Sequence, residues 1–187
     1  MGFFKWTAPA SDRWSDEGIG AICAWLAPFL ETRRAVLDLG GGTGALAVRL
    51  ADALPADVTV LDPDSRLASY VPGHARVRAV VGLAEQIPFS DGSFDAVIVS
   101  NAFHHFADQD KAVKEVARVL SPGGGLVVLD FDTRGLMRLN VWAERLFGTR
   151  GPFYSPDELA AYLVERGIRG SCFPTSKVSY CFVGRVG

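Results

Sequence analysis

The stretch V-L-D-L-G-G-G-T-G, residues Val36 to Gly44, predicts a buried strand that runs into a tight glycine turn. One acid, Asp38, interrupts the apolar run, and four glycines follow within five positions. The next residues, Ala45 to Leu50, have a helical pattern. A strand, a glycine turn and a helix N-terminus together present backbone N–H groups at the carboxyl edge of a sheet. Open α/β folds bind nucleotides and related ligands at this place, so we expect a ligand site here.

Apolar patterns along the rest of the chain alternate between those of strands and those of helices. Further strands are expected at residues 58–64, 76–81, 94–100, 125–131, 168–173 and 178–183. Helices are expected at residues 15–30, 45–50, 108–120, 136–147 and 155–165, with Pro28 ending or bending the first of them. This alternation predicts an α/β fold with a doubly wound, mostly parallel seven-stranded sheet. Helices cover both faces, and the last two strands form an antiparallel C-terminal hairpin.

Length and composition favour one globular domain, residues 1–187. The 187 residues are 49% hydrophobic and 21% charged with a net charge of -2, which argues against disorder and against nucleic acid as a partner. The three cysteines have no metal-ligand spacing, so we expect free thiols and no metal site. No leader segment and no apolar run of about 18 residues is recognised, which predicts a cytoplasmic protein without a membrane span. The oligomeric state stays open.

Two templates compete for the glycine turn. Gly40, Gly42 and Ala45 satisfy the dinucleotide fingerprint G-x-G-x-x-[GA], and Asp62 stands about 20 residues on, where a ribose-binding acid belongs. The second template is D-x-G-x-G-x-G, which Asp38, Gly40, Gly42 and Gly44 satisfy. In that template the acid matters as much as the glycines.

Two later stretches extend the second template. They are G-L-A-E-Q-I-P-F-S-D-G-S-F-D, residues 82–95, and R-V-L-S-P-G-G, residues 118–124. With the glycine turn they make the chain resemble the class I methyltransferases that use S-adenosylmethionine, in particular the small-molecule branch that includes the ubiquinone and menaquinone methyltransferases. The resemblance runs from Val36 to Phe131 and more loosely to Ile168, and it implies a Rossmann-like fold.

The resemblance also implies where S-adenosylmethionine binds as cofactor. The loop from Asp38 to Gly44 would wrap the methionine part, and Asp62 would take both ribose hydroxyls. One position departs from the family, because Leu83 stands where an Asp usually accepts a hydrogen bond from the adenine amino group. The implied cofactor-binding residues are Asp38, Gly40, Gly42, Gly44, Asp62, Pro63, Leu83, Ala84, Ser100 and Asn101. Two simpler interpretations remain: Asp62 caps the following turn, and Glu85 is a solvated loop acid.

Methyl transfer from a sulfonium requires the protein mainly to hold the acceptor close and to exclude water. Some acceptors also need a base with a pKa near 7. His104 and His105 follow the strand that ends at Ser100, so they are the candidate catalytic residues, although a structural role is the alternative. The chain lacks the Asn/Asp-Pro-Pro-Tyr/Phe motif of many base and amide methyltransferases after this strand. We therefore expect a small organic molecule as acceptor, methylated at O, N or C.

Substrate specificity would come from segments that cover the site. The candidates are the N-terminal arm and helix, residues 1–30, and a predicted short lid at residues 132–154. The apolar lid residues are Met137, Trp142, Phe147, Phe153 and Tyr154. Two other functions stay open: a non-catalytic binder of the same cofactor, and a nicotinamide-dependent oxidoreductase, which is disfavoured because no second domain is available.

Overall fold

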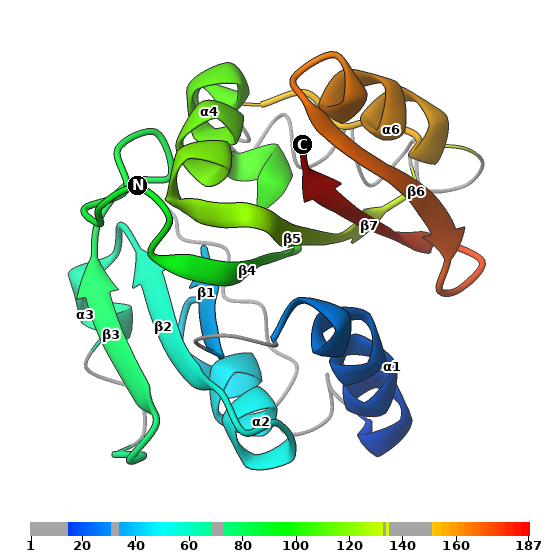
Figure 1. Ribbon diagram of the computed structural model, residues 1–187. Coiled ribbons are helices and arrows are strands. Elements are labelled where there is room, and N and C mark those ends of the chain that lie inside the picture. Colours follow the sequence, from blue (N-terminus) through cyan, green and yellow to red (C-terminus); the bar gives the residue numbers. More distant parts are fainter. Residues whose placement is uncertain (1–14, 31–33, 69–72, 133, 135–150) are drawn as a thin grey trace.

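A seven-stranded sheet forms the centre of the computed structural model, which describes residues 15–30, 34–68, 73–132, 134 and 151–187. The strand order is β3-β2-β1-β4-β5-β7-β6 (Figure 1). The pairs β3–β2, β2–β1, β1–β4 and β4–β5 are parallel, and β7 runs antiparallel to both β5 and β6. The strands are β1 (Ala35–Leu39), β2 (Asp57–Asp62), β3 (Val77–Val81), β4 (Phe94–Ser100), β5 (Leu120–Phe131), β6 (Ile168–Pro174) and β7 (Ser179–Val186). This arrangement confirms the predicted doubly wound sheet and its C-terminal hairpin.

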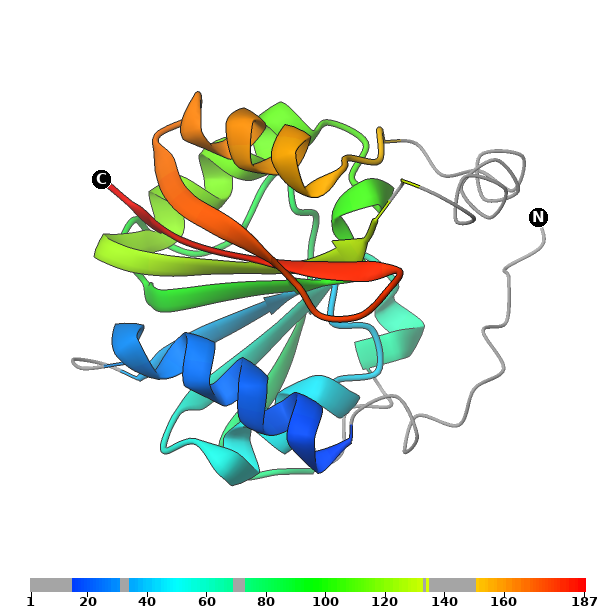
Figure 2. The same cartoon turned by 90° about the vertical axis from the view of Figure 1, so that its right-hand side faces the viewer.

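Helices cover both faces of the sheet (Figure 2). On one face lie α1 (Asp16–Leu26), the 3-10 turn η2 (Ala27–Phe29) and α2 (Ala45–Ala53); on the other lie α4 (Gln109–Val119) and α6 (Pro156–Val164). Two short elements were not predicted, namely α3 (Ser65–Ala68) beside β2 and β3, and the 3-10 turn η3 (Phe103–His105) after β4. No helix in the described ranges is long and apolar enough to cross a membrane.

The core consists of two apolar layers, one on each face of the sheet. The central strand β4 is buried on both faces from Phe94 to Val99, which explains its nearly continuous apolar sequence. Helix α4 packs Ala112, Val113 and Val116 into one layer, and α2 packs Leu46 and Leu50 into the other. The apolar residues therefore hold the carboxyl ends of β1, β2 and β4 side by side.

Local signals set most of the helix ends. Ser155 and Glu158 form a capping box at the start of α6, in which the Ser155 N–H donates to Glu158 Oε2 (2.8 Å). Helix α1 ends at Leu26, and η2 carries the chain through Pro28, as predicted.

Among the strands, the boundaries of β5 and β7 differ most from the prediction. Strand β5 begins at Leu120, directly after α4, rather than at Gly125, and β7 continues to Val186. Ser121-Pro122-Gly123, which the sequence predicts as a stop between helix and strand, belongs to β5. Gly125 is buried beneath Phe29, whose ring would lie 2.2 Å from an added Cβ. Residues 1–14 and the helix expected at 136–147 lie outside the described residues.

Candidate active site

The glycine turn after β1 has a left-handed backbone geometry that favours glycine. Gly40, Gly42 and Gly44 have φ angles of +75°, +56° and +72°. The Gly40 N–H donates to the Leu61 carbonyl (2.7 Å), which ties the turn to β2. A Cβ on Gly40 would lie 2.6 Å from Ala102 Cβ, so the turn also contacts the segment after β4. Gly44 then caps α2, whose N-terminus faces the turn.

Asp38 lies beneath this turn as an isolated buried acid. Asp38 is 1% exposed, and no described residue donates a hydrogen bond to either of its carboxylate oxygens. Burial first, and the charge of Asp62 second, raise the pKa of Asp38 to about 7. A Cβ on Gly41 would lie 2.5 Å from Asp38 Oδ2, so Gly41, which the motif treats as a spacer, is required as well. The site thus presents an unsatisfied carboxylate that a cationic group would stabilise.

Asp62 ends β2 and joins two turns. Its Oδ2 accepts a hydrogen bond from the Gly42 N–H (3.0 Å), and its Oδ1 accepts one from the Asp64 N–H (2.9 Å). The capping interpretation is therefore correct for one oxygen, while the other fixes the glycine turn. Each carboxylate oxygen can accept a second hydrogen bond, so this geometry is compatible with hydroxyl donors from a ligand.

Side chains of α4 hold the connection between β3 and β4 in place through hydrogen bonds to its backbone. Arg118 donates to the carbonyls of Ile87 (3.0 Å) and Phe89 (2.8 Å), and Glu115 accepts from the Ile87 N–H (2.8 Å). These bonds give the Arg of the R-x-L-x-P-G-G stretch a structural role. At the front of the connection, Ala84 is buried while the Leu83 side chain is 52% exposed. Leu83 therefore contributes an apolar surface at a position where an acid is usual in the family.

Glu85 corrects a prediction. Its Oε1 accepts hydrogen bonds from the backbone N–H groups of Ala107 (2.8 Å) and Asp108 (3.1 Å), just before α4. The interpretation of Glu85 as a solvated loop acid is wrong, because unpaired N–H groups at the start of a helix attract a carboxylate. Glu85 thus connects the segment of Leu83 and Ala84 to the segment that follows β4.

At the end of β4 the chain turns sharply. Asn101 has a φ of +51° and donates its N–H to the Leu129 carbonyl (2.8 Å). The Ser100 hydroxyl is buried, and no described residue satisfies it. Ser100 and Asp38 lie on neighbouring strands at the same edge of the sheet, since Asp38 pairs with Ile98. Two buried polar groups at one edge, without hydrogen-bond partners among the described residues, fit a polar ligand.

The two histidines after β4 have different environments. His104 is buried, and its Nδ1 lies 2.9 Å and 3.0 Å from the two carboxylate oxygens of Asp130 on β5. Its ring stacks on Phe153, with 4.4 Å between centroids. His105 is more exposed, although partial burial and the neighbouring His104 lower the pKa of His105 to about 4. His105 is therefore neutral at pH 7.

Asp130 was missed at the sequence level. It ends an apolar strand in the same way as Asp62, and it is 5% exposed. The signal was the acid in the stretch L-D-F at the end of β5, but only the structure brings this strand end beside η3. Among the described residues, no three His, Cys, Asp or Glu side chains are grouped as metal ligands.

The structure gathers only part of the predicted lid. Phe153 contacts His104, whereas Tyr154 packs against Phe103 and Tyr162 and so belongs to the core layer. The remaining predicted lid residues, Met137, Trp142 and Phe147, lie outside the described residues, as does the arm before Ser15.

Comparisons with known proteins identify the family of this chain. Residues 37–128 match the family described as "Methyltransferase domain". An uncharacterised methyltransferase of Mycobacterium tuberculosis is 44% identical over 103 residues, which are 54% of this chain and 41% of that protein. The chain thus spans less than half of that relative's length.

Two further matches extend over most of the chain. The ubiquinone/menaquinone biosynthesis C-methyltransferase of Bartonella bacilliformis is 32% identical over 181 residues, covering 89% of this chain and 68% of that protein. The crystal structure of an S-adenosylmethionine-dependent methyltransferase from Aquifex aeolicus has the same fold, with a TM-score of 0.70, 20% identity, and coverage of 94% of this chain and 100% of that one. The chain therefore belongs to the class I methyltransferases, whose cofactor is S-adenosylmethionine.

Proposed function

We propose that the protein transfers a methyl group from S-adenosylmethionine to a small organic acceptor, at O, N or C. The observation that carries the proposal is the glycine turn with the buried, unsatisfied carboxylate of Asp38 beneath it. That carboxylate suits a ligand that brings an ammonium group to a turn of backbone N–H groups. A pyrophosphate would instead place negative charge beside the buried Asp38, which disfavours a dinucleotide.

The residues at the sheet edge divide the cofactor among them in this proposal. Asp38 and the glycines at 40, 42 and 44 hold the amino-acid part, and Asp62 with Pro63 holds the ribose. Leu83 and the Ala84 N–H hold the adenine, while Ser100 and Asn101 lie beside the reactive end. When bound, S-adenosylmethionine supplies an electrophilic methyl group.

The chain itself would hold the acceptor beside the methyl group, exclude water and supply a proton acceptor. The buried Asp130 carboxylate at Nδ1 of His104 favours the tautomer that keeps the proton on Nδ1 and leaves the lone pair on Nε2. We propose His104 as the base where the acceptor must lose a proton, with Asp130 as its positioning residue. His105 is the second candidate and the weaker base of the two, because its pKa is lowered to about 4.

The name of one relative bears on the acceptor. The relative from B. bacilliformis carries the name of a C-methyltransferase of quinone biosynthesis, and this name is compatible with a small acceptor. We further propose a single domain over residues 1–187, covered by residues 1–30 and 132–154, in a cytoplasmic protein. All three cysteines are free, which suits a reducing compartment.

Calorimetric titration with S-adenosylmethionine, S-adenosylhomocysteine and NAD tests the cofactor. We expect both sulfur compounds to bind and NAD not to bind. Asp62→Ala should weaken binding by at least about tenfold, because a tenfold loss is only about 1.4 kcal/mol. Binding of NAD alone would overturn the proposal. If the sulfur compounds bind but no member of a broad acceptor panel is methylated, the non-catalytic alternative is favoured.

The pH dependence of methyl transfer tests the role of His104 and Asp130. In Asp130→Asn, kcat should fall and the acidic limb of its pH profile should move, while the affinity for S-adenosylhomocysteine stays unchanged. A variant that loses cofactor affinity and activity together, with an unchanged profile, would show a purely structural role.

A further inference from the structure

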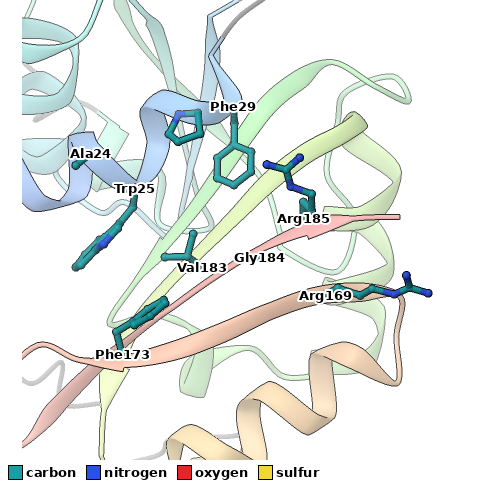
Figure 3. A pocket seen from close by; sticks show the side chains of 9 residues that line it. Ala24, Trp25, Phe29, Arg169, Phe173, Val183, Gly184 and Arg185 are labelled. Carbon is teal, nitrogen blue, oxygen red and sulfur yellow. The ribbon is translucent and has the colours of Figure 1, made fainter.

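A groove on the α1 face of the sheet lies apart from the glycine turn and takes no part in the proposed reaction. It has a volume of about 390 Å³ and lies between α1–η2 and the hairpin of β6 and β7 (Figure 3). Trp25 and Phe29 form one wall, Phe173 forms the other, and Val183 and Gly184 form the floor. Phe173 is 49% exposed, so the groove leaves a large apolar side chain open to solvent.

Strand alternation explains which side chains reach this face. On β6 the residues Arg169 and Phe173 share a face, and on β7 Val183 and Arg185 lie on the same face. The 3-10 turn η2 covers this face above β5, where Phe29 lies against Gly125, and the apolar layer that contains α1 extends over Cys181 on β7. Within the described ranges, the outer two strands therefore keep a partly exposed apolar strip, Phe173 and Val183, with two arginines at one end.

Arg169 and Arg185 place positive charge at one end of the groove. Arg169 and Arg185 are direct cross-strand partners in the antiparallel hairpin, a placement in which like charges destabilise the pair. Neither forms an ion pair with an acid among the described residues. The Arg185 guanidinium lies over the Phe29 ring, 5.3 Å from its centroid, and so borders the apolar strip, whereas that of Arg169 turns outward (Figure 3). An anion at this end would supply the Arg185 guanidinium with a charged partner.

We propose that this groove binds a small amphipathic anion, an apolar chain or ring with one carboxylate or phosphate group. The apolar part would lie against Trp25, Phe173 and Val183, and the anionic group would lie beside Arg185 with Arg169 near by. The groove volume of about 390 Å³ falls within the range of pockets for small molecules, which starts at about 300 Å³. A second copy of the chain is disfavoured because it would bring the same arginines together.

Octanoate is a suitable probe, with 1-octanol and octylammonium as its neutral and cationic counterparts. Titration of the ¹⁵N-labelled protein should shift the amide signals of Val183 to Arg185 and the indole N–H of Trp25 in a saturable way. We expect 1-octanol to bind at least about tenfold more weakly and octylammonium more weakly still. Equal binding of the three probes, or shifts scattered over the surface, would overturn the proposal.

Surface variants separate the contributions of charge and apolar surface. Arg185→Ser and Phe173→Ser should each weaken octanoate binding by about tenfold. Lys114→Ser removes the same charge from the opposite face on α4, and Val178→Ser removes an exposed apolar side chain outside the groove, so both should leave the affinity within about twofold. Equal losses in the two pairs would refute a specific site. None of the four changes should alter S-adenosylhomocysteine binding, so failure here is distinguishable from failure of the proposed methyl transfer.

Discussion

Replacing the buried carboxylate of Asp38 with the isosteric amide, Asp38→Asn, should make the stability of the ligand-free protein less dependent on pH. Burial and the charge of Asp62 raise the pKa of Asp38 to about 7 in the folded state. Between roughly pH 4 and pH 7 the folded state therefore binds more protons than the unfolded state, and the wild-type protein loses stability as the pH rises through this window. The amide does not titrate and cannot contribute such a loss.

The size of the effect follows from the same pKa. At about 1.36 kcal/mol per pH unit, the interval from about 3.9 to about 7 costs the folded state on the order of 4 kcal/mol at pH 8. About 2 to 3 kcal/mol of this loss falls between pH 5 and pH 8. This is a large part of the roughly 5 to 15 kcal/mol that stabilises a typical domain. An unsatisfied amide has its own cost, but that cost is the same at every pH.

Urea unfolding of the ligand-free protein at several pH values from about 5 to about 8 measures the difference. The free energy of unfolding of Asp38→Asn, relative to wild type, should rise by about 2 to 3 kcal/mol across this range. Asp57→Asn, which removes a carboxylate from the exposed start of β2, is the matched control and should show no such rise. Parallel curves for wild type and Asp38→Asn would refute the reasoning about burial.

The same variant links the acid to the cofactor. If an ammonium group binds beside Asp38, the affinity of the wild-type protein for S-adenosylhomocysteine should increase as the pH rises toward 8, because the bound cation favours the ionised carboxylate. Asp38→Asn should bind at least about tenfold more weakly at pH 8 and show a flat pH profile, since hydrogen bonds to charged groups contribute about 1.5 to 3 kcal/mol. Methylthioadenosine lacks the amino-acid part, so its affinity should not follow the pH in either protein.

Three further variants test neighbouring contacts. Leu83→Asp should tighten S-adenosylhomocysteine binding by about 0.5 to 1.5 kcal/mol through a new hydrogen bond, whereas Val81→Asp, at a similarly exposed apolar residue, should not; equal effects would exclude a specific adenine contact. Gly41→Ala should lower the free energy of unfolding by about 1 to 3 kcal/mol because its Cβ meets a carboxylate. Gly20→Ala in α1 meets no atom within 4 Å and should raise it by about 0.5 to 1 kcal/mol. Arg118→Met should lower the free energy of unfolding in urea by about 1 to 3 kcal/mol, because it leaves two carbonyls without their donor. An unchanged stability would contradict this structural role of Arg118.

The fold was predictable because burial and backbone geometry determine the residue types of its strands and turns. Strand β4 is buried on both faces and therefore apolar throughout, and the turn after β1 has positive φ angles and therefore contains glycines. Both features can be recognised from the residue types alone. The start of β5 was not predictable, because Ser121-Pro122-Gly123 indicates a turn locally. At Gly125 the absence of a side chain allows the approach of Phe29 from η2, a contact between distant parts of the chain.

The candidate site divides in the same way. Asp38 and Asp62 follow from the strand ends that they occupy, and the structure shows both beside the glycine turn. The pairing of His104 with Asp130 depends on two residues that are 26 positions apart and meet only through the register of β4 and β5. Glu85 accepts hydrogen bonds from backbone N–H groups. Because every residue other than proline has such a group, the sequence does not reveal this partner.

The two outermost strands, β3 and β6, bear on how the protein behaves at high concentration. The edge of a sheet carries unpaired backbone groups that can recruit a strand from another molecule and start aggregation. Strand β6 carries Arg169 and ends at Pro174, which has no N–H to offer, and β3 carries Arg78. Charge and a proline at these edges oppose strand-to-strand association, so a single added β-branched apolar residue in place of Arg169 would make the protein more prone to precipitate.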